Sequence, residues 1–210
     1  MKYKLLLSYI IIILLFLHFE KKDTDVLNEL CRQSPINIQP SNLDITYLNK
    51  NIKAEKGDIE HNNVHYNILN DNYLIFNNIK FKLLQYHFHN PSEHKLNDNK
   101  FPMELHMVHK SLNGEEFLVL GLFIVHGNSG PFDTSISLQQ QVNVNINKKI
   151  NKFYYYHGSL TTDPFSENVT WILVDEPIES STINKWNKSL GPARETLDNI
   201  YKSELLTFKT

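Results

Sequence analysis

Hydrophobic and polar residues alternate along much of this chain in short runs rich in Val, Ile, Tyr and Phe. On an extended strand, residues two apart point to the same face, so such a run has one apolar and one polar face. β-branched and aromatic residues also favour strands over helices. The pattern predicts a sheet-dominated fold with few, short helices. Residues 139–146, which are low in complexity, are expected to be a loop or the end of an element.

One run near the middle of the chain carries two histidines on one face. Gln85, His87 and His89 project together, while Tyr86 and Phe88 project the other way. The alternation predicts a strand with a polar, histidine-bearing face and an aromatic face.

A second run with the same period follows a polar stretch. Glu104, His106 and Val108 share one face, and His109 lies on the other. The intervening stretch contains Pro91, Pro102 and several asparagines, so it is interpreted as a hairpin-type connection between neighbouring strands.

Three histidines therefore converge on two neighbouring strands: His87, His89 and His106. Three neutral nitrogen ligands suit Zn²⁺, and a fourth position left to water is typical of a catalytic site. Such a zinc ion lowers the pKa of its water and yields hydroxide near neutral pH. Gln85 and Glu104 each stand two residues before a ligand on the same face, where they are expected to accept a hydrogen bond from its second ring nitrogen.

This arrangement resembles the central signature of the α-class carbonic anhydrases. Further segments that resemble motifs of that family follow in the expected order: Gln33-Ser34-Pro35-Ile36-Asn37-Ile38, Val119-Leu120-Gly121-Leu122-Phe123, Gly158-Ser159-Leu160-Thr161-Thr162 and Val169-Thr170-Trp171. The resemblance covers roughly residues 31–190. It implies one α-carbonic-anhydrase-like domain over residues 21–210, built on a twisted, mostly antiparallel central sheet.

The resemblance also implies catalytic roles. Thr161 would accept a hydrogen bond from the zinc-bound hydroxide and pass its own proton toward Glu93, which orients the hydroxide at carbon dioxide. His65 would be the proton shuttle, the alternative being a surface histidine. His94 and His109 would be buried framework residues that bond to neighbours such as Tyr156. The apolar wall for carbon dioxide would consist of Val108, Val119, Leu160, Val169 and Trp171, for which plain core packing is the alternative.

Length and composition agree with a single globular domain. The chain has 210 residues, of which 41% are hydrophobic and 21% charged, enough to bury a sizeable core. Its net charge of −2 gives no electrostatic footprint for nucleic acid. The partners that the family resemblance implies are carbon dioxide and bicarbonate.

The N-terminus resembles a targeting signal. Lys2 and Lys4 precede an apolar run over residues 5–17, the layout of a secretory signal peptide over residues 1–20. The run is short for a membrane span, so secretion is expected, with membrane anchoring only if the segment stays uncleaved. In the secretory pathway, Asn168 and Asn187 would be candidate N-glycosylation sites.

Several departures from the family bear on stability and activity. Cys31 matches the first half of a disulfide common in secreted members, but Phe165 stands at the second position, and the chain has a single cysteine. Asp163 stands where the family usually has proline. Residues 191–210 lack the family's Asn-x-Arg-Pro segment, so His89 is expected to lack its backbone acceptor. Missing terminal segments also predict exposed apolar sheet surface, low stability or weak self-association of an otherwise monomeric protein.

Two classes of function remain open from the residues. One is a zinc-dependent carbonic anhydrase that hydrates carbon dioxide reversibly to bicarbonate and a proton. The other is a catalytically weak or inactive carbonic-anhydrase-like binding or surface protein, because fold alone does not imply activity. The intact set of ligands, orienting residues, Glu93 and Thr161 favours the enzyme. A purely structural zinc site would need a fourth protein ligand, for which the motif offers no candidate.

Overall fold

The structure is a computed structural model that describes residues 34–35, 37–38, 51–60, 63–76, 78–146, 153–186 and 193–197. All of them lie in one of the chain's two compact units, Gln33–Thr210. The expected signal segment, Cys31 and Asn187 fall outside the described residues, so the predictions made for them stand as they were. Among the described residues, no helix is long and apolar enough to cross a membrane.

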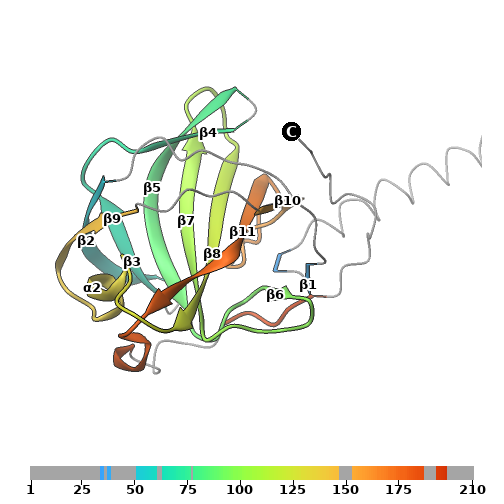
Figure 1. Cartoon of the computed structure of the whole chain (residues 1–210). Helices are drawn as coiled ribbons and strands as arrows, with labels where there is room; N and C mark the ends of the chain where they lie inside the picture. The colour runs from blue at the N-terminus through green and yellow to red at the C-terminus, as the bar shows by residue number, and fades with distance from the viewer. Residues whose placement is uncertain are drawn as a thin grey trace, which may run out of the picture. The chain divides into compact units, whose positions relative to one another are not determined.

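Strands dominate the described part of the chain (Figure 1). They are β1 (Asn37–Ile38), β2 (Asn51–Glu60), β3 (Asn63–Ile68), β4 (Tyr73–Phe76), β5 (Ile79–His89), β6 (Lys95–Leu96), β7 (Met103–Ser111), β8 (Phe117–His126), β9 (Gln141–Asn145), β10 (Phe153–Gly158) and β11 (Val169–Ser180). Two short helices accompany them, α2 (Asp133–Ile136) and the 3₁₀ helix η1 (Ile183–Lys185). The prediction of a mainly β fold with few, short helices is confirmed.

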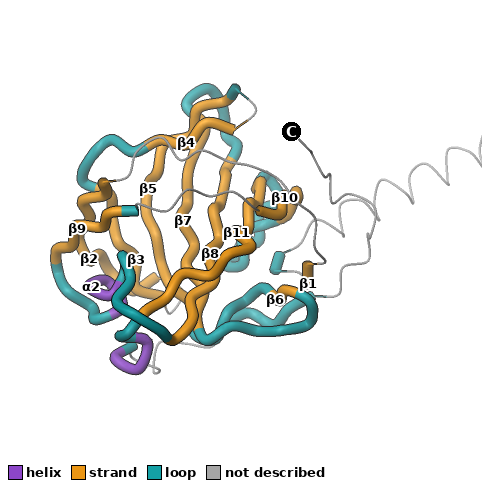
Figure 2. The backbone as a smooth tube through the Cα atoms, viewed as in Figure 1, coloured by secondary structure: helices purple, strands orange, loops and turns teal. Residues whose placement is uncertain are grey.

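Nine of these strands form one twisted sheet, visible as the band of arrows in Figure 1 and of orange tube in Figure 2. Their order is β10-β11-β8-β7-β5-β3-β2-β9, with β4 added beside β5. Every pairing is antiparallel except that between β8 and β11, which is parallel. The strands that carry the histidines, β5 and β7, therefore sit in the middle of the sheet. β1 and β6 form a separate parallel pair.

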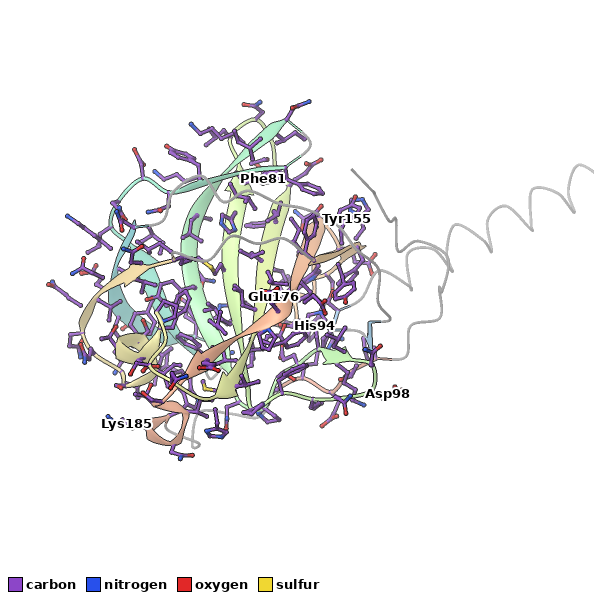
Figure 3. The ribbon with its side chains drawn as sticks, in the orientation of Figure 1. Phe81, His94, Asp98, Tyr155, Glu176 and Lys185 are labelled. Atoms are coloured by element: carbon purple, nitrogen blue, oxygen red, sulfur yellow. The ribbon has the colours of Figure 1, made fainter. Side chains whose placement is uncertain are left out.

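Buried hydrophobic residues form two groups, a large core and a small core. Figure 3 labels two members of the large core, Phe81 and Tyr155, among the side chains of the domain. The small core consists of Leu96, Val108, Val119, Phe123, Tyr154, Tyr156, Val169, Trp171 and Leu173. The large core includes Tyr66, Leu83, Tyr86, Phe88, Leu105, Met107, Leu118, Leu120, Phe132, Ile172 and Trp186. Strand alternation explains the division: on β8, Leu118 and Leu120 belong to the large core, while Val119 and Phe123 belong to the small core.

A β-bulge at Leu84 decides which face of β5 carries the histidines. Leu83 pairs with His109 and Gln85 pairs with Val108, so Leu84 is an extra residue on β5. Before the bulge the odd-numbered Leu83 enters the large core, whereas after it the even-numbered Tyr86 does. The bulge thereby directs the odd-numbered residues after it, among them His87, to the opposite face.

The polar connection between β5 and β7 contains structure of its own. The short strand β6 lies within it, and Leu96 and Asn99 exchange backbone hydrogen bonds of 3.0 and 3.1 Å around Asn97 and Asp98. Both central residues have positive φ, at 50° and 64°, the conformation that Asn and Asp tolerate best among residues other than glycine. The interpretation as a hairpin-type connection holds, with this tight turn added to it.

The expectation for residues 139–146 was wrong in part, because Gln141–Asn145 forms the edge strand β9. Val142 and Val144 are buried, while Gln141, Asn143 and Asn145 are exposed. This short alternation is a strand pattern that the low complexity of the sequence concealed.

Gly121 links the sheet to the histidines, because it lies opposite His106 in the pairing of β7 with β8. A methyl group at Gly121 would collide with Leu173 Cδ2 and lie 3.2 Å from Glu104 Oε1. We expect Gly121→Ala to lower the free energy of unfolding by about 1–3 kcal/mol through overpacking, measured by urea denaturation. Gly114→Ala is the control, since its methyl group would meet only Ser111 Oγ at 3.4 Å. Equal midpoints for the two variants would contradict this account of Gly121.

Candidate active site

The three histidines predicted as metal ligands lie side by side and are buried. His87 pairs directly with His106 across β5 and β7, and His89 follows two residues along the same face. The ring centroids are 5.3 Å apart for His87 and His106, 5.0 Å for His87 and His89, and 4.5 Å for His89 and His106. One nitrogen from each ring lies within 4.8 Å of the others, so the three can hold one metal ion.

In His87 and in His106, one ring nitrogen is hydrogen-bonded to a neighbouring side chain, which leaves the other ring nitrogen available to a metal ion. His87 Nδ1 lies 3.0 Å from Gln85 Oε1, and His106 Nε2 lies 2.9 Å from Glu104 Oε1. The predicted orienting roles of Gln85 and Glu104 therefore agree with this geometry. The remaining nitrogens are Nε2 of His87 and Nδ1 of His106.

His89 differs from the expectation, because its Nδ1 does have an acceptor nearby. Glu93 Oε1 lies 3.3 Å from this atom, so a side chain supplies the acceptor that we expected the chain to lack. The other ring nitrogen, Nε2, is buried and has no hydrogen-bond partner. A buried polar nitrogen without a partner is costly, and a metal ion at this position would satisfy it. The three side chains thus fit a zinc ion by both position and free donor atoms.

Burial and mutual repulsion keep the rings of His87 and His89 neutral. The pKa values of His87 and His89 are held well below their ordinary value, chiefly by burial and then by the neighbouring imidazoles. Neutral imidazole is the form that binds a metal, so His87 and His89 can bind one at neutral pH without first losing a proton.

Glu104 is the buried carboxylate beneath the histidines. Its Oε2 accepts hydrogen bonds from the backbone N–H groups of Glu93 and His94, each at 2.9 Å. Its Oε1 lies 2.8 Å from His94 Nδ1, in addition to its bond with His106. Burial alone would raise the pKa of Glu104, but the adjoining imidazoles and these hydrogen bonds hold it well below its ordinary value. Glu104 therefore places a negative charge behind the metal position.

His94 continues this network away from the histidine cluster. Its Nε2 lies 2.6 Å from the Tyr156 hydroxyl, which in turn lies 2.9 Å from Ser34 Oγ. The Ser34 backbone N–H donates to Ser159 Oγ at 2.9 Å. The expected framework role of His94 agrees with these bonds. His109 is also buried, and its Nδ1 lies 2.9 Å from the Met107 carbonyl oxygen.

Thr161 and Glu93 interact through their side chains next to the histidine cluster. Burial raises the pKa of Glu93, while the electrostatic interaction with the His106 ring and a side-chain hydrogen bond from Thr161 act against that rise. Both side chains are buried, at 2% exposed for Glu93 and 8% for Thr161. The pairing expected from the sequence is therefore present in the structure.

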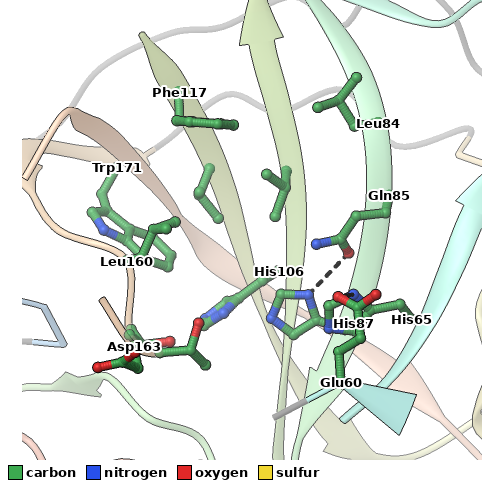
Figure 4. Close-up of a pocket in the computed structure, with 14 residues that line it drawn as sticks. Glu60, His65, Leu84, Gln85, His87, His106, Phe117, Leu160, Asp163 and Trp171 are labelled. Atoms are coloured by element: carbon green, nitrogen blue, oxygen red, sulfur yellow. Dashed lines mark hydrogen bonds and ion pairs between the residues drawn. The ribbon is translucent and has the colours of Figure 1, made fainter. Parts of the chain in front are cut away.

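A pocket with a volume of about 270 Å³ opens onto the cluster (Figure 4). Its lining residues are Glu60, His65, Leu84, Gln85, His87, His106, Val108, Phe117, Val119, Leu160, Thr161, Thr162, Asp163 and Trp171. In Figure 4, Trp171, Leu160 and Phe117 stand on one side of the pocket, and His65 and Glu60 stand on the other beside His87. The pocket therefore has an apolar wall facing a polar one.

The structure places four of the five predicted wall residues on this pocket and differs on the fifth. Val108, Val119, Leu160 and Trp171 line it, whereas Val169 does not. Val169 is 2% exposed and belongs to the small core; it lies two residues from Trp171 on the same face of β11, at the start of the strand and outside the pocket lining. Core packing is the better description of this residue.

His65 lies inside the pocket and stacks on His87, with ring centroids 4.9 Å apart and planes inclined by 20°. Its Nδ1 lies 3.4 Å from Glu60 Oε2. This placement favours the shuttle hypothesis over an ordinary surface histidine. Glu60 escaped the sequence analysis because its only signal is its place near the end of β2, opposite Asn63.

Comparison with known proteins agrees with this geometry. A family model described as eukaryotic-type carbonic anhydrase matches residues 26–201. The chain belongs to the α-class carbonic anhydrase family. A carbonic anhydrase of Pectobacterium atrosepticum is 31% identical over 77% of this chain and 73% of that protein. One from Nostoc is 37% identical over 52% of this chain, which spans only 46% of that relative's length.

Solved structures of the family also share the fold. The α-carbonic anhydrase of Photobacterium profundum matches with a TM-score of 0.65 and 26% identity, covering 81% of this chain and 87% of that one. The likeness supports the predicted α-carbonic-anhydrase-like sheet as well as the family assignment.

The family model matches through residue 201, whereas the resemblance recognised from the motifs ends near residue 190. Residues 193–197 form hydrogen bonds with Glu93 and with the Ser34 carbonyl oxygen. The expectation that residues 191–210 leave apolar sheet surface exposed stays a prediction. The sequence analysis missed Arg194 because the residues around it do not match the family segment, and the arginine alone is a weak signal.

The buried carboxylate of Glu104 should control metal affinity. In Glu104→Gln the shape is kept, but the amide nitrogen would face N–H donors and the negative charge would be lost. We expect zinc affinity, measured by competition with a chelator, to fall about ten- to hundredfold. Glu115→Gln is the control, because Glu115 is 88% exposed and pairs only with Lys110 among the ion pairs of the described residues. Unchanged affinity in Glu104→Gln would show that the charge behind the histidines has no such role.

Proposed function

We propose that this protein is a zinc-dependent carbonic anhydrase that hydrates carbon dioxide reversibly to bicarbonate and a proton. The observation that carries the proposal is the buried cluster of His87, His89 and His106, whose ring nitrogens lie within 4.8 Å of one another beside a pocket that His87 and His106 line. When bound by three neutral nitrogens, zinc supplies a nucleophile from water near neutral pH. Family membership supports the same reaction.

The residues around the cluster have separate tasks in this proposal. His87, His89 and His106 hold the metal, and Glu104 offsets its charge. Thr161 donates its proton to Glu93, which leaves the Thr161 oxygen free to accept a hydrogen bond from the attacking group. A nucleophile fixed in this way presents a lone pair to the substrate in one orientation.

The apolar wall suits the substrate. Carbon dioxide is neutral and weakly polar, so it gains little from hydrogen bonds and rests best against hydrocarbon. Val108, Val119 and Trp171 offer such a surface next to His106, whose ring centroid is 4.7 Å from that of Trp171. The charged bicarbonate product gains more from water, which favours its release.

His65 completes the proposal as the group that carries protons between the pocket and solvent. It is 15% exposed, so it contacts both the interior and the solvent, and Glu60 beside it is 64% exposed. Secretion and glycosylation remain proposals from the sequence. Asn168 is exposed, and its side-chain nitrogen donates to the Glu115 carbonyl at 2.7 Å.

Removing one ligand should remove the metal. We expect the protein to contain about one zinc ion per chain and His106→Ala to lose it, because two imidazoles bind zinc far more weakly than three. Metal content is measured by elemental analysis after dialysis, and melting temperature with and without chelator gives an independent measure, since bound metal stabilises the folded state. His126→Ala, at the exposed end of β8, is the control. Full zinc occupancy in His106→Ala would contradict the ligand assignment.

Removing the Thr161 hydroxyl should separate catalysis from metal binding. We expect Thr161→Ala to lower kcat/KM for carbon dioxide hydration by about a hundredfold, because the nucleophile loses its orienting acceptor, while zinc content stays unchanged. Stopped-flow hydration with a pH indicator and elemental analysis measure the two quantities. Thr162→Ala, which alters the next residue in the pocket lining, is the control. Parallel loss of zinc and activity would mean that Thr161 is structural.

A further inference from the structure

Residues 193–197 hold Glu93 although they are about a hundred positions away in the sequence. The Arg194 backbone N–H donates to Glu93 Oε1 at 2.8 Å, a separation of 101 residues. Thr196 Oγ1 donates to the Glu93 backbone carbonyl at 2.9 Å. The segment therefore fixes both the side chain and the backbone of the carboxylate that accepts the proton of Thr161.

The side chain of Arg194 fastens this segment at two further points. Its Nη1 donates to the Ser34 carbonyl oxygen at 2.6 Å. Its guanidinium carbon lies 4.1 Å from the centroid of the Phe165 ring, within the range of a cation–π contact. The Leu197 backbone N–H also donates to the Pro35 carbonyl at 3.0 Å. Arg194 is half-buried, so these contacts are partly shielded from water.

Phe165 belongs to the loop that carries Thr161. The loop is closed by hydrogen bonds from the Phe165 N–H to the Thr162 carbonyl, 2.8 Å, and from the Leu160 N–H to the Ser166 carbonyl, 2.9 Å. Phe165 has a φ of 57°, which is unfavourable for an aromatic residue and persists only where neighbouring contacts hold it. The Arg194 guanidinium is one such contact.

We propose that Arg194 is a positioning residue that aligns Thr161 with Glu93, because it holds the Glu93 carboxylate through its backbone and the Thr161 loop through its side chain. The inference rests on the proposed function, since it assigns the hydrogen bond between those two residues to catalysis. A hydrogen bond weakens steeply when its angle or length is disturbed, so a small shift of either partner costs activity.

The test compares Arg194→Met in two backgrounds of the zinc-loaded full chain. Methionine keeps the backbone N–H and much of the side-chain length but loses the guanidinium. In the wild type, Arg194→Met should lower kcat/KM for carbon dioxide hydration about tenfold at unchanged zinc content. In Glu93→Ala it should cause no further fall, because its effect acts through Glu93. An equal fall in both backgrounds would overturn the proposal.

Two companion variants sharpen the result. Arg194→Lys keeps a cation over Phe165 and should recover part of the lost activity. Lys100→Met is the matched control, because Lys100 Nζ contacts the same segment at Glu195 Oε2, 3.9 Å away. It should leave kcat/KM unchanged. A loss in Lys100→Met as large as in Arg194→Met would show that any weakening of this segment suffices, and would overturn the specific role of Arg194.

Amide hydrogen exchange supplies a readout that does not depend on activity. The amide of residue 194 donates to a buried carboxylate, so it should be protected in the wild type. In Arg194→Met it should exchange about tenfold faster, while amides of β7 and β8 keep their protection. Unchanged exchange at residue 194 would overturn the proposal. If the wild type lacks hydration activity but the exchange behaves as expected, the proposed function fails while the positioning by Arg194 stands.

Discussion

The ionised carboxylate of Glu104, fully buried at the centre of the sheet, is the interaction on which the rest of the site depends. An isolated charge in this position would be strongly unfavourable, and it is tolerated because two backbone N–H groups and two imidazoles surround it. Each of those donors is thereby fixed in place. Glu104 orients the backbone of Glu93, the ring of His94 and the ring of His106. One residue therefore positions both a metal ligand, His106, and the proposed proton acceptor, Glu93.

From this carboxylate, polar contacts run in two directions through an otherwise apolar layer. One passes through His94 and Tyr156 to Ser34, and the other passes through Glu93 to Arg194. Both reach the segment at Ser34, since the Arg194 guanidinium binds its carbonyl oxygen. Ser34 and Arg194, 160 residues apart in the sequence, are therefore joined by hydrogen bonds within one network. Because a buried network is strong only when each member is satisfied, its members depend on one another.

The sequence predicted those parts of the site that depend on strand alternation and on local motifs. The convergence of His87, His89 and His106, and the orienting contacts of Gln85 and Glu104, follow from a period of two on paired strands. Arg194 could not be found in this way, because its contacts span about a hundred residues and depend on where a loop crosses the domain. Val169 was misplaced for a related reason: alternation gives the face of a strand, but not how far along that face a pocket extends. The edge strand β9 was missed because only a few alternating residues carry it.

The bulge at Leu84 determines which face of β5 carries the histidines. The side chain is 41% exposed, so its chemistry contributes little to the core. Residue 84 instead adds one position to β5 that has no partner on β7, and the bulge absorbs it. Deleting Leu84 would remove the bulge and leave a regular pairing, in which Gln85 follows Leu83 and the histidines keep their face. If Leu84 instead paired as an ordinary strand residue, every later side chain of β5 would change faces, and the imidazoles would turn toward the large core. The face that carries the metal ligands thus depends on the bulge absorbing this one residue, so the hydrogen-bond register of β5 with β7 matters here more than the side chain does.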